Sequence, residues 1–330
     1  MSRPPYVTTG RYAPPAARRE LTVTSADGSR LHAEVHGPED APAVVLAHGW
    51  TCSTAFWAPV VRLLADDHKV VVYDQRGHGR SPAAGPGGYS TDALADDLEA
   101  VLEAALESGE RAVLVGHSMG GMTAMAAARR PGMRERAAAV LLCSTGAADL
   151  AAEAMVIPLR SPGARRFAHR AILGSRAPLG PVTAPGKRVL KYATMGPAAT
   201  PEQIEACARI VHSCPTGVRA QWGKALAGLE LTGEVARLEV PTAIVAGTAD
   251  RLTPIVLARR LASVLPNCLD LTELPGAGHM TPVEEPDAVA DRIRALVRDH
   301  LTAAAPEPAA LAPKQKTKAR RAREAKEKSA

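Results

Sequence analysis

Short apolar segments alternate with amphipathic ones along most of the chain, which predicts a largely parallel sheet covered by helices on both faces. An alternating pair around a Gly-containing turn, 21–23 and 31–35, predicts a β-hairpin near the N-terminus. Six further segments have the length and apolar content expected of strands: 43–47, 70–73, 112–115, 138–142, 241–246 and 269–274. The predicted fold class is therefore α/β.

Helical spacing of apolar residues follows most of these strands. Residues 53–65 place their large apolar side chains on one face, and a helix opened by Ser90 or Thr91 repeats leucine and valine with the period of a helix. Another helix is expected from Thr253-Pro254 to about residue 265. Thr281-Pro282-Val283-Glu284 has the spacing of a capping box and predicts the start of a last helix that reaches about residue 300.

The alternation stops after residue 146. Residues 147–229 contain helical segments, one of them opened by the capping box Thr200-Pro201-Glu202-Gln203, and no convincing strand. This predicts a helical cap inserted between two parts of one core. The expected organisation is a Pro-rich extension, disordered or loosely draped, a first core part, the cap, a second core part, and an Ala/Pro linker with a basic tail: 1–20, 21–146, 147–229, 230–302 and 303–330.

One stretch carries the strongest chemical signal. Residues 111–130 contain an apolar strand, then Gly116-His117-Ser118-Met119-Gly120, then Ala-rich helical sequence. A G-x-S-x-G motif between a strand and a helix is typical of a nucleophile elbow, in which a sharp turn exposes the serine hydroxyl. Ser118 is therefore the candidate nucleophile.

A serine nucleophile needs a base and an acid that orients the base. His279 is the one histidine of ten in a glycine-flanked loop directly after a late predicted strand. Asp250 follows the preceding strand and is the candidate acid, with Asp149, after the strand before that, in reserve.

Five motifs in this order on these elements resemble the α/β-hydrolase superfamily, most closely its esterase-like and cofactor-free haloperoxidase-like branches: Ala47-His48-Gly49-Trp50, the run from Asp74 to Ser81, the elbow, Gly247-Thr248-Ala249-Asp250 and Gly278-His279. The resemblance spans roughly residues 21–301. It implies the α/β-hydrolase fold with a helical cap, and a triad in the chain order Ser118, Asp250, His279. Asp149 is in reserve because some members of this fold place the acid there. Backbone N–H groups of Trp50 and Met119 are the candidate oxyanion hole. His48, His117 and the Asp74–Ser81 run are interpreted as structural.

The expected reaction is cleavage of a carboxylic ester through an acyl-enzyme. The partner is a small-molecule ester, and the cap, with its few aromatics Phe167, Tyr192 and Trp222, favours small-to-medium apolar substrates. The same triad serves perhydrolases, haloperoxidase-like enzymes, thioesterases and C–C bond hydrolases, and these alternatives stay open. So does an inactive binding protein of this fold. No nucleotide-binding motif or metal-ligand spacing is present, so no cofactor and no metal are expected.

Charge is concentrated at the end of the chain. Residues 314–330 hold eight Lys or Arg and two Glu, which accounts for the whole net charge of +6. The tail is interpreted as a solvated, partly helical segment or, alternatively, as an anchor for nucleic acid or an anionic membrane. The chain has no apolar run long enough to span a membrane and no secretory h-region. Five scattered cysteines suit a reducing compartment, so a cytoplasmic location is expected.

Overall fold

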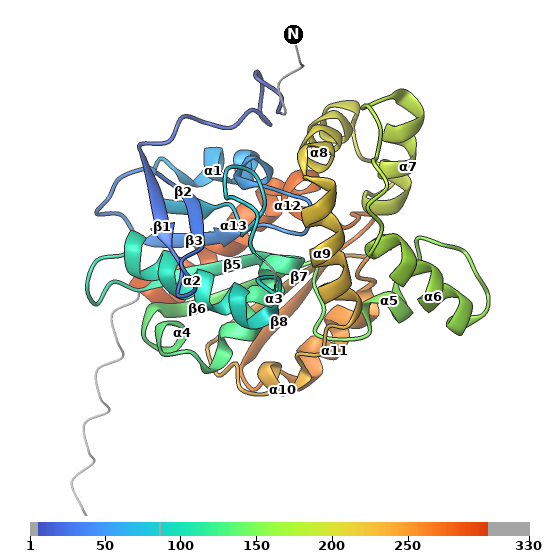
Figure 1. The fold of residues 1–330 in the computed structure, drawn as a ribbon. Helices are drawn as coiled ribbons and strands as arrows, with labels where there is room; N and C mark the ends of the chain where they lie inside the picture. The colour runs from blue at the N-terminus through green and yellow to red at the C-terminus, as the bar shows by residue number, and fades with distance from the viewer. Residues whose placement is uncertain (1–5, 86, 303–330) are drawn as a thin grey trace, which may run out of the picture.

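The computed structural model describes residues 6–85 and 87–302. Its centre is an eight-stranded sheet in the order β1-β2-β4-β3-β5-β6-β7-β8 (Figure 1). The bounds of the strands are β1 Arg19–Thr24, β2 Arg30–His36, β3 Ala43–Ala47, β4 Lys69–Tyr73, β5 Ala112–His117, β6 Ala137–Cys143, β7 Thr242–Gly247 and β8 Cys268–Leu274. The predicted hairpin and all six further predicted strands are present.

Only the hairpin edge of the sheet is antiparallel. β1 pairs with β2 and β2 with β4 in antiparallel fashion, whereas all pairs from β4 to β8 are parallel. β3 lies between β4 and β5. The chain therefore adds β4 on one side of β3 and then β5 on its other side. Ligands of open parallel sheets bind beside such a switch point, at the carboxyl ends of the strands. The loops after β3 and β5 meet there.

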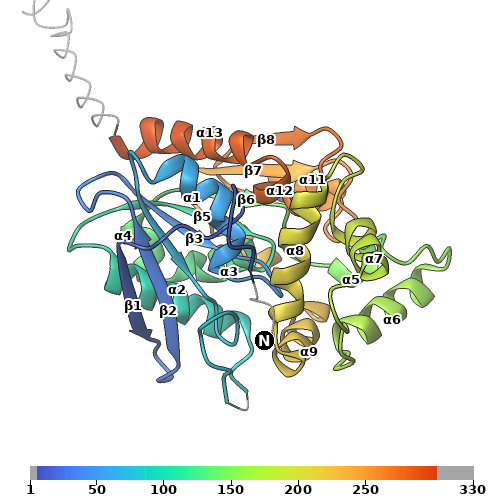
Figure 2. The ribbon, with the colours of Figure 1, turned by 90° about the horizontal axis from the view of Figure 1, so that it is seen from above.

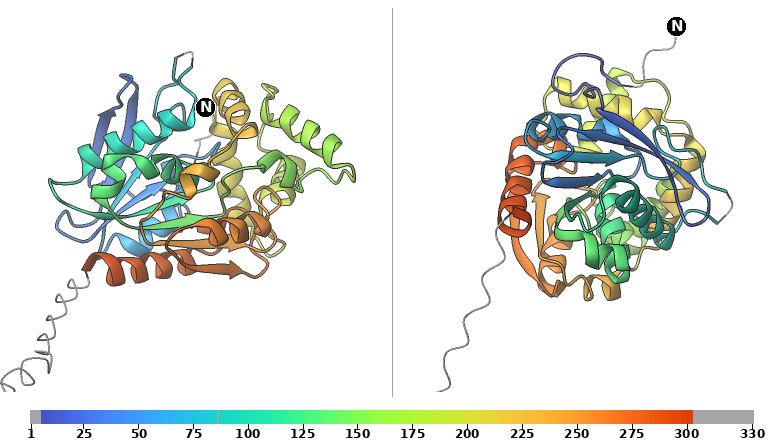
Figure 3. Two further views of the ribbon diagram at one scale, coloured as in Figure 1. Left: turned by 90° about the horizontal axis from the view of Figure 1, so that it is seen from below. Right: turned by 90° about the vertical axis from the view of Figure 1, so that its left-hand side faces the viewer.

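Each central strand contributes to two cores because successive side chains point to opposite faces of the sheet. In β3, Val45 packs in one apolar cluster, while Val44 and Leu46 pack in the other. Helices α2, α3 and α11 cover the first face, and α1 and α13 cover the second (Figures 1 and 3). Their bounds are α1 Ala58–Leu64, α2 Thr91–Ala105, α3 Met119–Ala126, α11 Ile255–Val264 and α13 Pro286–Val297.

Six helices lie between β6 and β7. The short α10, Thr232–Val235, comes just before β7. The other five lie where the sequence predicts helices: α5 Leu150–Glu153, α6 Pro162–Leu173, α7 Ala184–Thr194, α8 Pro201–Ser213 and α9 Thr216–Ala227. They gather at one end of the molecule, with α6 and α7 outermost (Figure 2). The predicted capping box at α8 is confirmed, since Thr200 and Gln203 bond reciprocally. An isolated antiparallel bridge, Ala148 to Glu230, joins the start of this segment to its end.

The predicted capping box at Thr281 is wrong. Thr281 lies inside the short helix α12, Thr281–Glu284, with Met280 as its N-cap, and Pro286 starts α13 separately. The Thr281 hydroxyl lies 3.0 Å from that of Ser144, and Glu284 binds backbone groups of other segments. Tertiary partners thus take both side chains of the motif. The structure also adds a helix not predicted, α4 Pro131–Arg136.

The described part of the N-terminal extension runs along the surface without forming a helix or strand before β1. Arg62 donates two hydrogen bonds to the Ala13 carbonyl (3.2 and 2.9 Å), and Arg11 pairs with Asp287. For residues 6–18 the structure therefore favours the draped over the disordered alternative. The predicted linker and basic tail lie outside the described residues. Within the described residues, no helix combines the length and apolar character needed to cross a bilayer.

Candidate active site

Ser118 lies at the sharp turn between β5 and α3, as the motif predicts. Its backbone has φ 51° and ψ −115°, a strained conformation for any residue other than glycine. Close packing holds the turn, because a Cβ on Gly120 would lie 2.1 Å from the Ala47 carbonyl oxygen of β3. The Thr145 hydroxyl donates to the Ser118 carbonyl at 2.8 Å. Contacts from the ends of both neighbouring strands, β3 and β6, thus hold Ser118 in this strained conformation.

The loop after β3 lies directly beside Ser118. A Cβ on Gly49 would come within 3.1 Å of the Ser118 Cβ, so only glycine permits this approach. Thr51 takes φ 64° and donates its N–H to His78 Nε2 at 3.2 Å, which fixes the path of the loop around Trp50. Met119 is the first residue of α3, and N–H groups in the first turn of a helix have no carbonyl partner within the helix.

His279 and Asp250 are brought together from the loops after β8 and β7. His279 Nδ1 lies 2.8 Å from Asp250 Oδ2. The other carboxylate oxygen accepts N–H groups of Leu252 and Thr253 at 2.7 and 2.9 Å. Because a carboxylate accepts, Nδ1 carries the proton and Nε2 is left as the basic nitrogen. Ser118, His279 and Asp250 are all buried, with 8%, 4% and 1% of their surfaces exposed.

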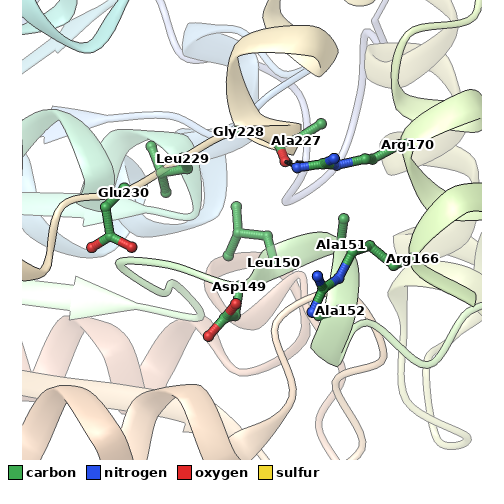
Figure 4. A pocket seen from close by; sticks show the side chains of 10 residues that line it. All are labelled: Asp149, Leu150, Ala151, Ala152, Arg166, Arg170, Ala227, Gly228, Leu229 and Glu230. Carbon is green, nitrogen blue, oxygen red and sulfur yellow. Dashed lines mark hydrogen bonds between the residues drawn. The ribbon is translucent and has the colours of Figure 1, made fainter. Parts of the chain in front are cut away.

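The reserve acid Asp149 lies elsewhere. Its side chain is 61% exposed, and its nearest cation is Arg260 at 4.0 Å. It lines a surface pocket of about 180 Å³ between the start of α5, helix α6 and the end of α9, together with Arg166 and Arg170 (Figure 4). Neither Ser118 nor His279 lines this pocket. The geometry therefore separates Asp149 from the histidine that Asp250 contacts.

Three residues outside the predicted site contact the His279 loop or its partners. Thr253 donates its hydroxyl to Asp250 Oδ2 at 2.7 Å and lies 3.1 Å from His279 Nδ1. His117, interpreted as structural, has its Nε2 2.8 Å from the His279 carbonyl oxygen, and burial lowers its pKa well below the usual value. A neutral ring with its proton on Nε2 donates this bond. Gly196, just after α7, is tied to the same loop through Glu284.

Glu284 holds the two residues that flank His279. Its carboxylate accepts backbone N–H groups of Gly278 (3.0 Å), Met280 (3.1 Å) and Gly196 (2.7 Å). Burial raises its pKa, although the three N–H donors oppose the shift. The capping-box prediction missed this role of Glu284, because the loops that Glu284 joins are far apart along the chain.

We expect Glu284→Gln to lower the free energy of unfolding by about 1–3 kcal/mol, because the amide turns an NH₂ group toward backbone donors. It should also lower kcat for an ester, since the His279 loop loses a support. Urea unfolding and ester turnover measure both effects. The matched control is Glu285→Gln at the exposed neighbouring position, which should change neither. Equal behaviour of the two variants would contradict the support role.

The Asp74–Ser81 run is hydrogen-bonded to the segment after β3 and to α3. Asp74 accepts the N–H groups of Thr54 and Arg80, both at 2.8 Å. His48 Nε2 accepts the N–H of Gln75 at 3.0 Å, and the Gln75 amide oxygen accepts the hydroxyl of Thr123 in α3 at 2.8 Å. These contacts agree with the structural interpretation of the run and of His48.

Asp74 should make stability depend on pH. Burial raises its pKa to about 6 from an ordinary value of 3.8, although backbone donors oppose this. The folded chain therefore holds the Asp74 proton more tightly than the unfolded chain does. Protonation of Asp74 stabilises the fold fully below pH 3.8, and this stabilisation is lost as pH rises to about 6. The expected loss is ~3 kcal/mol at most. Urea unfolding across this range checks it. In Asp74→Asn this part of the pH dependence should be absent. If the free energy of unfolding of the two proteins changes in parallel between pH 3.8 and 6, Asp74 is not its source.

The three aromatics of residues 147–229 differ in burial. Trp222 is buried and donates its Nε1–H to the Arg76 carbonyl at 3.1 Å. Phe167 and Tyr192 are 76% and 45% exposed on the outside of α6 and α7. Phe167 and Tyr192 therefore do not pack in the protein interior as Trp222 does. Trp50 does reach α9, where its Nε1–H donates to the Arg219 carbonyl at 3.0 Å.

One group of described residues has the composition of a metal site. Glu20, His32 and Glu34 place potential ligand atoms within 4.8 Å of one another on the β1–β2 hairpin. Arg80 donates two hydrogen bonds of 2.8 Å to the Glu20 carboxylate, so a guanidinium already supplies the counter-charge. This arrangement gives no reason to assign a metal there.

Comparison with known proteins agrees with this geometry. The model of the alpha/beta hydrolase family matches residues 44–292, so the chain belongs to that family and is an enzyme of the hydrolase class. The chain is 32% identical over 260 residues to "Putative carbamate hydrolase RutD" of Variovorax paradoxus (strain S110), covering 77% of this chain and 91% of the relative. It is 28% identical to "Bifunctional esterase/perhydrolase DCH" of Acinetobacter calcoaceticus, covering 84% of this chain and 99% of the relative.

Solved structures show the same fold. A thermophilic esterase from Thermogutta terrifontis superposes with a TM-score of 0.69 at 27% identity, over 85% of this chain and 98% of the esterase. The enol-lactonase from Burkholderia xenovorans LB400 gives a TM-score of 0.66 at 25% identity, over 84% and 100%. The predicted α/β-hydrolase fold is therefore confirmed.

Proposed function

We propose that the enzyme hydrolyses carboxylic esters of small-to-medium apolar substrates through Ser118, His279 and Asp250. The observation that carries this proposal is the 2.8 Å contact between His279 and Asp250 in a fold that places Ser118 at a strained strand-to-helix turn. A serine hydroxyl is a weak nucleophile until a neighbouring base takes its proton. The two loops supply that base and hold its tautomer.

The reaction has two steps. His279 Nε2 takes the hydroxyl proton as Ser118 Oγ attacks the carbonyl carbon, and the oxyanion is stabilised by the N–H groups of Trp50 and Met119. The imidazolium, stabilised by Asp250, then protonates the leaving alcohol. In the second step His279 takes a proton from water as the water oxygen attacks the acyl carbon. The bond to Ser118 Oγ then breaks, the imidazolium returns the proton to Ser118 Oγ, and the carboxylic acid leaves.

Helices α5–α9 act as a cap in this proposal, and residues 147–229 are its extent. Ser118 is only 8% exposed. The bond between the Trp50 side chain and the Arg219 carbonyl of α9 links the cap to the oxyanion loop. Substrate entry then requires these residues to move, and the cap limits the size of acyl group that enters.

A fluorophosphonate probe followed by peptide mass spectrometry tests the nucleophile. We expect stoichiometric labelling of Ser118 and loss of labelling in His279→Ala, with the variant still folded by circular dichroism. Labelling of another residue, or labelling of Ser118 that survives His279→Ala, would reject the triad. Folded protein that takes up no probe would favour the inactive binding protein.

The names of two relatives define the competing reactions. A carbamate, or the attack of peroxide on the acyl-enzyme, uses the same serine, histidine and oxyanion hole, as do thioester and C–C bond hydrolysis. Turnover of p-nitrophenyl acetate, butyrate and octanoate should exceed that of an aryl carbamate, and halide oxidation with acetate and peroxide should be minor. A preference for the carbamate or for peroxide would replace the ester assignment and leave the triad in place.

A further inference from the structure

The outer part of the cap has an unusual charge distribution. Between Glu153 and Glu202 the chain has no Asp or Glu, while the 48 residues 154–201 include eight Lys or Arg. Lys187 pairs with Glu205 of α8 at 3.1 Å. Within the described part of the chain, none of the other seven has a carboxylate partner within salt-bridge distance. This surface is therefore strongly cationic.

The same segment exposes most of the large apolar side chains found on the surface. Of ten exposed large apolar residues among those described, seven lie in residues 155–192: Met155, Leu159, Phe167, Ile172, Leu179, Val189 and Tyr192. Phe167 and Val189 are 76% and 67% exposed. We call residues 155–192 the basic apolar face. Large apolar side chains exposed together in one segment, beside Lys and Arg, favour an interaction surface.

We propose that the basic apolar face docks on an anionic lipid surface. Helices that carry Lys and Arg beside aromatic and aliphatic side chains lie in the interface of anionic bilayers, where the cations meet the headgroups and the apolar groups enter the acyl boundary. Figures 1 and 2 place α6 and α7 outermost at one end of the molecule, which leaves them accessible to a broad surface.

Other occupants fit this composition less well. A second copy of the same face would bring two cationic surfaces with no carboxylates into contact, and like charges repel. A nucleic acid would satisfy the arginines, but Leu159, Ile172, Leu179 and Val189 would gain no apolar contact from it. An anionic lipid interface is the partner that uses both the charge and the aliphatic groups.

The docked face would be connected to the loops of the hydrolytic site. The Thr194 carbonyl at the end of α7 accepts the N–H of His279 at 2.8 Å. Arg251, the residue after Asp250, donates to the Tyr192 carbonyl at 2.8 Å and stacks over the Tyr192 ring at 4.5 Å. Docking would thus set the site against the lipid surface. The docking itself does not depend on the chemistry of Ser118, so either proposal can fail without the other.

Sedimentation with sucrose-loaded vesicles tests the docking. The full-length chain is mixed with vesicles of phosphatidylcholine alone or with equal parts of phosphatidylglycerol. We expect binding only to the anionic vesicles. Phe167→Ser with Val189→Ser should lower the partition coefficient by roughly tenfold, because two apolar side chains no longer leave water. Arg166→Gln with Arg188→Gln should also lower it.

Matched controls separate this face from other surfaces. Val264→Ser and Val256→Ser replace valines of α11 that are 44% and 37% exposed and lie outside residues 155–192, so they should leave binding unchanged. Replacing the eight Lys and Arg of residues 314–330 by Gln isolates the contribution of the tail. The described chain ends at the opposite end of the molecule from α6 (Figures 1 and 2). Binding that disappears with the tail charges but survives Phe167→Ser with Val189→Ser would overturn the proposal.

A spectroscopic readout shows whether residue 167 enters the lipid. Trp57 and Trp222 are buried and Trp50 is half-buried. The fluorescence that Phe167→Trp adds to that of the unsubstituted protein comes from an exposed position. Its emission should move to shorter wavelength on mixing with anionic vesicles and stay unchanged with neutral ones. No shift, or a dimer in solution that Phe167→Ser with Val189→Ser abolishes, would contradict docking to lipid.

Discussion

Replacing Ser118 with alanine should lower kcat for an ester by about 10⁴- to 10⁶-fold, because the nucleophile, base and acid of such a triad act as a unit. The substitution removes one oxygen atom from a buried site and leaves the Asp250–His279 contact in place, so the fold should survive. KM should change little, since the hydroxyl acts in bond formation more than in holding the substrate.

Ser144→Ala is the matched control for this variant. Ser144 also ends a parallel strand of the sheet, also takes a positive φ (44°), and is also buried. Its hydroxyl contacts Thr281 rather than the proposed nucleophile. We expect Ser144→Ala to retain turnover within a few-fold of the unsubstituted enzyme, consistent with the loss of one hydrogen bond. Activity of Ser118→Ala within tenfold of the unsubstituted enzyme would reject Ser118 as the nucleophile.

Replacing Arg76 with methionine should destabilise the protein by about 3–5 kcal/mol, the cost of leaving a buried carboxylate without its counter-ion. Arg76 is 1% exposed and donates Nε–H and Nη2–H to the two oxygens of Asp97 at 2.7 and 2.6 Å. It also bonds Asp27 of the hairpin turn at 2.8 Å. Its carbonyl accepts the Trp222 indole of α9. One residue thus joins the hairpin, α2 and the helical segment.

A double-mutant cycle separates the charge from the packing. Asp97→Leu combined with Arg76→Met removes both charges and leaves apolar groups of similar size, so the double variant should recover most of the stability lost in Arg76→Met. Urea unfolding monitored by circular dichroism gives the three values. A cost below 1 kcal/mol for Arg76→Met, or no recovery in the double variant, would show that the buried pair does not hold these elements together.

The order and type of the core elements follow from local sequence. Continuous apolar segments such as 43–47 become buried parallel strands because both faces of such strands are covered. The G-x-S-x-G turn leads to a strained Ser118 because small neighbours permit the close approach of β3. Sequence also predicts that Ser118, Asp250 and His279 lie near one another, because each follows a strand and the carboxyl ends of parallel strands share one edge of the sheet.

Contacts between distant segments were decided only by the tertiary structure. The spacing around Thr281 resembles a capping box, yet Glu284 binds the loops around Gly196 and Gly278, which local propensity cannot anticipate. Packing likewise decided that Phe167 and Tyr192 are exposed while Trp222 is buried, because helical periodicity alone does not show which neighbour covers a face. Similarly, two aspartates follow strands, and only the paths of the two loops decide that Asp250 rather than Asp149 reaches His279. Sequence by itself therefore determined the fold and the reacting residue types, whereas packing determined their partners.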